Sequence, residues 1–341
     1  MSARASHPLV AIVAALSVLL LGLGGCGGSG EGDASTTGGN DPAAERTITD
    51  AKGVAVTVPG KPERVLPLSE PTLDATIALG LKPVGTTAGR GQNAIPSYLQ
   101  ARTKDVKSVG GLGQPNLEQV AALAPDVILL DGTAFQDAAV IDKLRQIAPT
   151  VFVSKTGADW RTAFEQTADA LGRKTEGADV LAAYDQHVNE TKLALKGKTD
   201  QQISVVRWAG IGLPAVFGNE LIAGRVLTDI GLQRPKSQAL KGPGHSIPVS
   251  LEELEAIDGD WIFFGALGGG SADAGGVDTP ADVASAQQAI AYAKDTPGFT
   301  RLKAYKANQV IPVDGSAWTS AGGPIAAKVI VDDIARNLGA Q

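Results

Sequence analysis

The chain is poor in the residues that most often carry chemistry. Its 341 residues include one cysteine, one methionine and three histidines, and aromatic residues make up 4%. One cysteine excludes an internal disulfide, and a chain of this length can bury a core without one. So few histidines and thiols also argue against a zinc or bare-metal centre, which needs clustered ligands. We therefore expect no bound metal or cofactor.

Basic residues are also fewer than acidic ones, 30 against 36, so the formal net charge is −6. This balance argues against a nucleic-acid partner. Motifs of common enzyme classes are missing as well: no P-loop, no G-x-S-x-G and no G-x-G-x-x-G that opens a helix after a strand. The sequence therefore favours a binding protein over an enzyme, and we expect it to be a monomer.

The N-terminal segment has the pattern of a signal peptide. Apolar residues fill most of positions 9–23 behind Arg4, a run too short to span a membrane comfortably. The sole cysteine follows in Leu23-Gly-Gly-Cys26, which resembles the lipobox of a bacterial lipoprotein. We predict a signal peptide over residues 1–25 and an acylated Cys26 on the outer face of the cytoplasmic membrane. An ordinary secretory signal with an incidental cysteine is the alternative.

Behind Cys26 the composition changes twice. Residues 27–44 are mostly Gly, Ser, Thr, Asp and Glu, so we predict a flexible tether over 26–44. From residue 45, strand-like and helix-like segments alternate, which predicts an α/β fold with a mostly parallel sheet. The predicted strands cover 65–68, 83–86, 126–130, 150–154, 203–207 and 261–264, and two predicted helices cover 73–79 and 141–147.

An internal repeat indicates two related lobes. Residues 116–130, NLEQVAALAPDVILL, match residues 250–264, SLEELEAIDGDWIFF. Each copy opens with an N-cap residue, Asn116 or Ser250, and a capping-box partner three positions on. Two weaker echoes, 65–68 with 203–207 and 78–83 with 229–235, follow the same order. We predict lobes over 45–158 and 199–341; chance likeness of helix-strand units is the alternative.

A helical segment over 159–198 is predicted to join the lobes. Asp159 is its expected N-cap, and apolar residues recur at helical spacing on both sides of a break near 172–177. Neither proline nor glycine interrupts 178–196. A continuous helix of that length would be roughly 28 Å long and would act as a stiff connection.

Several motifs resemble one known family. They are VGGLGQPNLE at 109–118, KLRQIAPTV at 143–151, VSLEEL at 249–254, and VDGSAW at 313–318 followed by GGP at 322–324. Together they resemble the substrate-binding proteins of ABC importers for iron–siderophore complexes, heme and cobalamin, over residues 45–338. The resemblance implies two Rossmann-like lobes joined by one long helix, with the ligand between them. It also implies capture of a ferric siderophore for delivery to an importer; heme or cobalamin is the alternative ligand.

One segment departs from the family pattern. Residues 265–297 are longer and richer in Gly and Ala than is usual there. We interpret their first part as either a lid over the ligand or a solvated insertion.

The resemblance also suggests ligand-binding residues. A siderophore already surrounds iron with oxygen, so its binder needs cations and aromatic faces rather than metal ligands. Arg90 follows a predicted strand, Arg207 and Trp208 end another, and Trp318 occupies the family's aromatic position. The alternatives are a solvated loop arginine for Arg90 and interlobe packing for Trp318.

Four further residues complete the predicted sites. Phe135 and His245 are weaker candidates for the ligand site, with core packing and an exposed loop as their respective alternatives. The resemblance implies docking on a permease through one acid on each lobe. Asp74 matches the position on the first lobe; on the second, Thr228 falls at the expected position and Asp229 is its neighbour. Each could instead be an ordinary surface aspartate.

Overall fold

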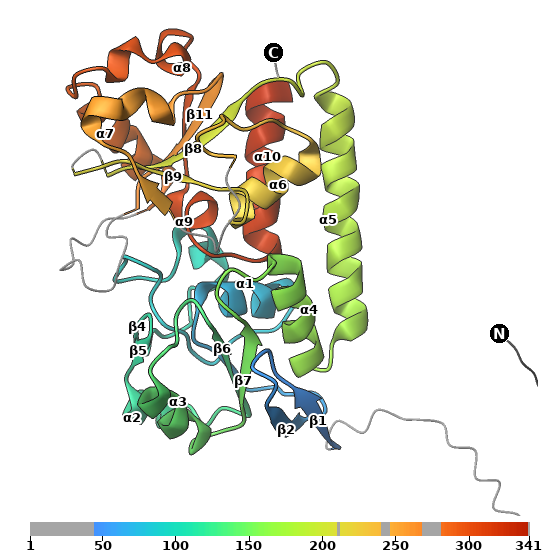
Figure 1. The fold of residues 1–341 in the computed structure, drawn as a ribbon. Helices are drawn as coiled ribbons and strands as arrows, with labels where there is room; N and C mark the ends of the chain where they lie inside the picture. Colours follow the sequence, from blue (N-terminus) through green and yellow to red (C-terminus); the bar gives the residue numbers. More distant parts are fainter. Residues whose placement is uncertain (1–43, 210–211, 240–245, 268–280, 340–341) are drawn as a thin grey trace, which may run out of the picture. The chain divides into compact units, whose positions relative to one another are not determined.

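Two main β-sheets organise the chain, one built from each half of the sequence (Figure 1). This computed structural model describes residues 44–209, 212–239, 246–267 and 281–339. Cys26, His245 and residues 268–280 of the Gly-rich segment therefore lie outside the described residues. In the described part, no helix is both long and apolar enough to cross a membrane.

The first sheet is parallel throughout. Its strand order is β3 (Val65–Pro67), β6 (Val127–Asp131) and β7 (Thr150–Ser154), and all three strands are buried. Continuous burial of apolar runs is what a parallel sheet covered on both faces requires. The predicted strand over 83–86 is not one: a lone bridge joins Thr86 to Ser108. Pro83 has no N–H to donate, which limits any ladder at this edge.

The second sheet is mixed. Its order is β10 (Ser246–Pro248), β9 (Ala215–Phe217), β8 (Ile203–Arg207), β11 (Trp261–Gly265) and β12 (Val310–Val313). Strands β8, β11 and β12 are parallel, as predicted, whereas β9 and β10 form an antiparallel edge that the sequence pattern did not indicate.

The repeat occupies equivalent places in the two sheets. Its first copy forms α2 (Leu117–Ala122) and then β6, which lies between β3 and β7. Its second copy forms a 3₁₀ helix (Leu251–Ile257) and then β11, which lies between β8 and β12. The two N-caps are present: Asn116 Oδ1 accepts from Gln119 N at 3.0 Å, and Ser250 Oγ from Glu252 N at 3.2 Å. The predicted lobe boundaries themselves stay a prediction.

The remaining elements are helices over the sheets and two small hairpins. The helices are α1 (Glu70–Ala78), α3 (Ala138–Arg145), α6 (Ile222–Ile230), α7 (Val283–Ala293), α8 (Lys303–Lys306), α9 (Gly315–Trp318) and α10 (Pro324–Gly339), with 3₁₀ helices at Ser97–Arg102 and Phe299–Arg301. The hairpins pair β1 (Glu45–Thr49) with β2 (Ala55–Pro59), and β4 (Gly110–Gly111) with β5 (Gln114–Pro115).

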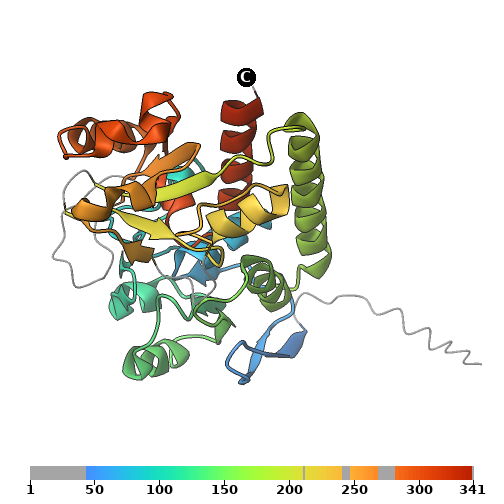
Figure 2. The same ribbon diagram turned by 45° about the horizontal axis from the view of Figure 1, so that its top comes forward.

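The connecting segment is a pair of helices with a short break. Helix α4 (Trp160–Ala170) begins after Asp159, whose side chain accepts from Arg161 N as an N-cap. Helix α5 (Lys174–Ala194) has 21 residues and includes Gly177, so the break is narrower than predicted. Gly172, at φ +65°, turns the chain between them. Figures 1 and 2 show α5 beside α10, and it also packs on α4 and α6, so it contacts elements of both halves.

Candidate ligand-binding site

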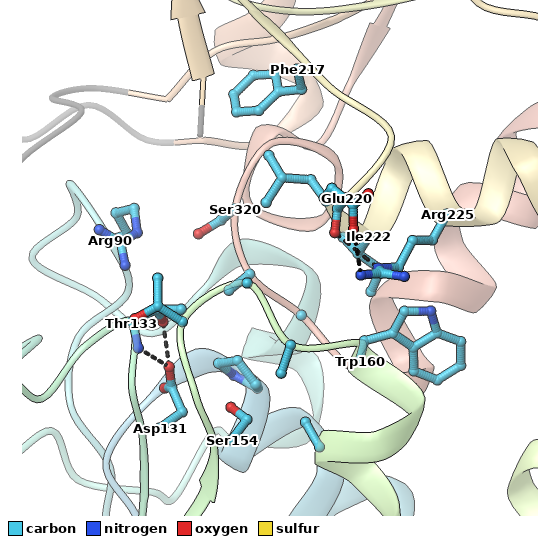
Figure 3. Close-up of a pocket in the computed structure, with 18 of the residues that line it drawn as sticks. Arg90, Asp131, Thr133, Ser154, Trp160, Phe217, Glu220, Ile222, Arg225 and Ser320 are labelled. Carbon is cyan, nitrogen blue, oxygen red and sulfur yellow. Dashed lines mark hydrogen bonds and ion pairs between the residues drawn. The ribbon is translucent and has the colours of Figure 1, made fainter. Parts of the chain in front are cut away.

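A pocket opens where strands of both sheets end (Figure 3). Asp131 ends β6, Ser154 ends β7 and Arg207 ends β8, and all three line it. Open α/β sheets hold ligands at the carboxyl ends of their parallel strands, because the chain leaves the sheet there in loops. The pocket has roughly 1080 Å³ of free space, counted out to its mouth. Both halves of the chain therefore contribute to one candidate site.

Arg90 brings an unpaired guanidinium to this pocket. Its loop is held by the backbone N–H of Arg90, which donates to Glu70 Oε1 at 3.0 Å. The Arg90 side chain lines the pocket and, among the described residues, makes no hydrogen bond or ion pair. Arg90 thus lines the candidate pocket, and its ligand-binding role stays a prediction.

Arg207 faces the same pocket from the second sheet. Its guanidinium donates to Thr319 O and to Ser246 Oγ, both at 3.2 Å, and lies 5.0 Å from the centre of the Phe217 ring. Burial, and then the positive charge of Arg90, lower the pKa of Arg207 to about 10. Arg207 therefore stays cationic at neutral pH, and the charges of the two arginines repel each other. Among the described residues, no carboxylate forms an ion pair with either of them. An anion between them would relieve that repulsion.

The third arginine of the pocket is already neutralised. Arg225 Nη1 lies 2.6 Å from Asp159 Oδ2. Its Nη2 lies 3.0 Å from Glu220 Oε2, beside the pocket (Figure 3). Asp159 precedes α4 and Glu220 precedes α6, so this network joins the two halves beside the pocket. Since its single positive charge is shared by two carboxylates, Arg225 serves structure rather than an incoming anion.

Two carboxylates near the arginines were not found from the sequence. Glu70 is buried behind the pocket, and its Oε2 accepts from Ser320 Oγ at 2.6 Å. Burial raises the pKa of Glu70, and the charge of Arg90 opposes that rise. Asp131 accepts from Thr133 N at 2.7 Å through Oδ1, while its buried Oδ2 has no partner among the described residues. Asp131 ends β6, and Glu70 begins α1 three residues after β3, so each lies near the carboxyl end of a predicted strand.

Trp208 and Trp318 do not line the pocket, which corrects the expected ligand stacking. Trp208 is 2% exposed and packs on Phe264 and Phe299, whereas Trp318 is fully buried and stacks on Phe263 at 4.4 Å. Side chains alternate between the faces of a strand, so the neighbour of a pocket-facing Arg207 turns into the core. Neither indole, as placed, can reach a ligand.

The aromatic residues that line the pocket are different ones. Trp160, at the start of α4, and Phe217, at the end of β9, border it (Figure 3). They are only 5% and 2% exposed. Phe135 is buried in the core on the first sheet rather than in the pocket lining, so its core-packing alternative is the one the structure supports.

Asp74 is buried, which corrects its predicted place on a docking surface. Its carboxylate accepts from Tyr98 Oη at 3.0 Å and from the backbone N–H groups of Ile325 and Ala326 at 2.9 Å each. It thereby caps the start of α10. Burial raises the pKa of Asp74 to about 6, against the effect of these hydrogen bonds. No oxygen is left to meet an external cation.

Asp229 does reach the surface of α6, but it is already paired. Its Oδ2 accepts from Tyr184 Oη at 2.9 Å and lies 3.3 Å from Arg161 Nη2. About a third of its side chain is exposed. Its docking role stays a prediction. Separately, the described residues contain no group of three His, Cys, Asp or Glu placed to hold a metal ion.

Comparison with known proteins gives consistent matches. The model of the periplasmic binding protein family matches residues 72–317. The probable siderophore-binding lipoprotein YfiY of Bacillus subtilis is 30% identical over 295 residues, 85% of this chain and 86% of the relative. The Fe(3+)-citrate-binding protein YfmC of the same organism is 28% identical over 98% of both chains. The crystal structure of Staphylococcus aureus SirA complexed with staphyloferrin B superposes with a TM-score of 0.69 at 28% identity, covering 86% of this chain and 98% of SirA.

Proposed function

We propose, from the premise that this chain belongs to the periplasmic binding protein family, that its pocket captures a ferric siderophore and delivers it to an ABC importer. The family and the relatives above are binding proteins, which confirms the prediction of a binding protein over an enzyme. The iron–siderophore complex is the transported ligand rather than a cofactor.

One observation carries the proposal: two arginines that form no ion pair with any described carboxylate converge on one pocket. Arg90 comes from the first half of the chain and Arg207 from the second. Chelation places iron inside a shell of electron-rich oxygens, and guanidinium groups bind such oxygens while keeping their charge in a partly dry site. The protein then needs no bond of its own to the iron.

Heme is the main alternative, and the structure gives it little support. A heme binder of this kind would supply a histidine or tyrosine as axial ligand. Tyr98 and His245 are the two residues that the sequence suggests for this role. The hydroxyl of Tyr98 donates to Asp74, and Tyr98 does not line the pocket. The other, His245, lies outside the described residues. For cobalamin, no described feature of the pocket favours the ligand over an anionic iron complex.

We further propose that the protein acts while anchored to a membrane. Cys26 and the segment around it would carry the lipid that holds the protein on the outer face of the cytoplasmic membrane. The likeness of residues 23–26 to a lipobox supports this, as do relatives that are named lipoproteins. The tether over 26–44 would leave the folded part free to meet ligand and permease.

Calorimetric titration of the purified protein with a panel of ferric siderophores, heme and cobalamin tests the proposal. Arg90→Gln and Arg207→Gln should each weaken ferric siderophore binding about five- to thirtyfold, as expected for a charge-assisted contact of about 1–2 kcal/mol. Arg145→Gln, on the surface of α3, is the control and should bind normally. Tight binding of heme or cobalamin with no binding of any ferric siderophore would contradict the proposal.

A further inference from the structure

The lining of the pocket carries information about which siderophores fit it. We infer that the ligand is a net-anionic ferric complex of the hydroxycarboxylate class, which presents carboxylate and hydroxyl oxygens rather than aromatic rings. The inference rests on the proposed function and narrows it. Three properties of the described lining support this ligand class: its charge, its hydroxyl groups and its lack of open aromatic faces.

The charge of the pocket is opposite to that of the whole chain. The chain carries a net charge of −6, yet the pocket gathers Arg90, Arg207 and Lys155, none of which forms an ion pair among the described residues. Two carboxylates in the described lining oppose these cations, Asp131 and Glu220. Glu220 is already bound to Arg225, so Asp131 supplies the remaining negative charge. Glu70, behind the lining, adds a second negative charge only as far as it is ionised, and burial raises its pKa.

This charge selects among the ways of binding ferric iron. Three hydroxamates carry three negative charges, so their complex with Fe³⁺ is neutral. Three doubly deprotonated hydroxycarboxylates or catecholates carry six, so their complex with Fe³⁺ is negative. An unneutralised cationic pocket with low-dielectric walls favours the negative complexes. Neutral and cationic hydroxamate complexes would leave the repulsion between Arg90 and Arg207 in place.

The hydroxyl groups of the pocket suit a ligand that both accepts and donates hydrogen bonds. Ser246 Oγ accepts from Arg207, so its own proton is available to a ligand carboxylate. Thr156 Oγ1 donates to Gly132 O at 2.7 Å, so its lone pairs are available to a ligand hydroxyl. The unpartnered Oδ2 of Asp131 offers a further acceptor. The lining hydroxyls are those of Thr133, Ser154, Thr156, Ser246, Thr319 and Ser320.

Aromatic contact is what separates the two anionic classes. Catecholate rings are held best by open aromatic faces or edges. In the described lining, Trp160 and Phe217 are nearly fully buried, and the guanidinium of Arg207 lies over the Phe217 ring. A catecholate complex would find charge here but little to stack on, whereas a hydroxycarboxylate complex needs only charge and hydrogen bonds.

The test compares four ferric complexes on the full-length protein by calorimetry: ferric citrate in excess citrate, ferric enterobactin as the tris-catecholate, neutral ferrichrome and cationic ferrioxamine B. Iron-free citrate and gallium citrate are the ligand controls. We expect ferric and gallium citrate to bind at least about tenfold more tightly than either hydroxamate, equal to about 1.4 kcal/mol. Iron-free citrate should bind more weakly than both, and raising the salt should weaken citrate binding.

Charge variants make the result specific to this pocket. Lys155→Gln and Arg207→Gln should narrow the preference for ferric citrate over ferrichrome, and Asp131→Asn should widen it. Tightest binding of ferrichrome, ferrioxamine B or ferric enterobactin would overturn the inference while leaving the proposed function in place. Binding of heme with no binding of any of the four complexes would overturn the proposed function itself.

Discussion

Glu70 Oε2 and Ser320 Oγ share a hydrogen bond of 2.6 Å although 250 residues separate them in the chain. The other oxygen of Glu70 accepts from the backbone N–H of Arg90 at 3.0 Å. Thr319, next to Ser320, accepts from the Arg207 guanidinium through its carbonyl. One buried carboxylate thus joins the segment that carries Arg90 to the segment that accepts a hydrogen bond from Arg207.

Substitutions of Glu70 should separate its geometry from its charge. Glu70→Gln can still accept from Arg90 N and donate to Ser320, but it removes a negative charge near the ligand, so an anionic ferric complex should bind several-fold more tightly. Glu70→Ala removes both hydrogen bonds and should weaken binding about tenfold. Calorimetry measures both. Equal losses in the two variants would show that the charge, not the position, of Glu70 matters.

Asp74 should make stability depend on pH in the unusual direction. Its pKa is about 6 in the folded chain against an ordinary 3.8. Between these values the folded state holds a proton that the unfolded state has lost, so raising the pH from 4 to 7 removes stability, by up to about 3 kcal/mol.

Urea unfolding of the natural protein and of Asp74→Asn at pH 4.5 and pH 7 checks this. Other carboxylates titrate in both proteins and cancel in the difference. The advantage of the natural protein over the variant should be larger at pH 4.5. An advantage that grows toward pH 7 would mean that the carboxylate is favoured, not disfavoured, by its buried site.

Trp318 should matter for stability and not for ligand affinity. Trp318→Phe keeps a ring against Phe263 but removes the indole N–H that donates to Asp333 Oδ2 at 2.8 Å. Leaving that carboxylate short of a donor should cost about 1–3 kcal/mol of unfolding free energy. Ligand affinity, measured by calorimetry, should stay within about twofold. A large loss of affinity at unchanged stability would contradict this prediction and indicate that Trp318 contacts the ligand.

Of the two predicted docking acids, Asp74 is buried and Asp229 is partly exposed. Asp229→Asn should leave ferric siderophore binding unchanged and lower iron uptake by cells, since charge pairs on an exposed surface guide docking. Asp332→Asn, on the surface of α10, is the matched control. Normal uptake with Asp229→Asn would remove this residue from the docking surface.

Cys26 should decide where the protein resides. Cys26→Ser should move it from the membrane fraction to the soluble extracytoplasmic fraction, because a tether without acyl chains has nothing to hold it. Ser35→Ala, within the same tether, should stay with the membrane. Membrane retention of Cys26→Ser would contradict the lipid anchor.

Local patterns in the sequence were enough for the fold class and for most of the parallel strands. Continuous apolar runs over 126–130 and 150–154 mark strands buried on both faces, and polar N-caps such as Asn116 and Asp159 mark where helices begin. These features depend on neighbours a few residues away, so the sequence shows them directly. The sequence also placed Arg207 at the pocket, because it is a charged residue at the end of the buried strand β8. Arg90 lines the pocket as well, although residues 83–86 before it form no strand.

Tertiary structure alone decided which side chains face the ligand. The sequence suggested Trp208 and Trp318 as ligand-binding residues, yet both are buried in the core. An indole buries more apolar surface than almost any other side chain, which favours that position. Asp74 was expected on the surface of a helix, but both it and Glu70 hydrogen-bond to the segment at the start of α10, some 250 residues away. Contacts at that separation leave no local pattern, so only the folded chain shows them.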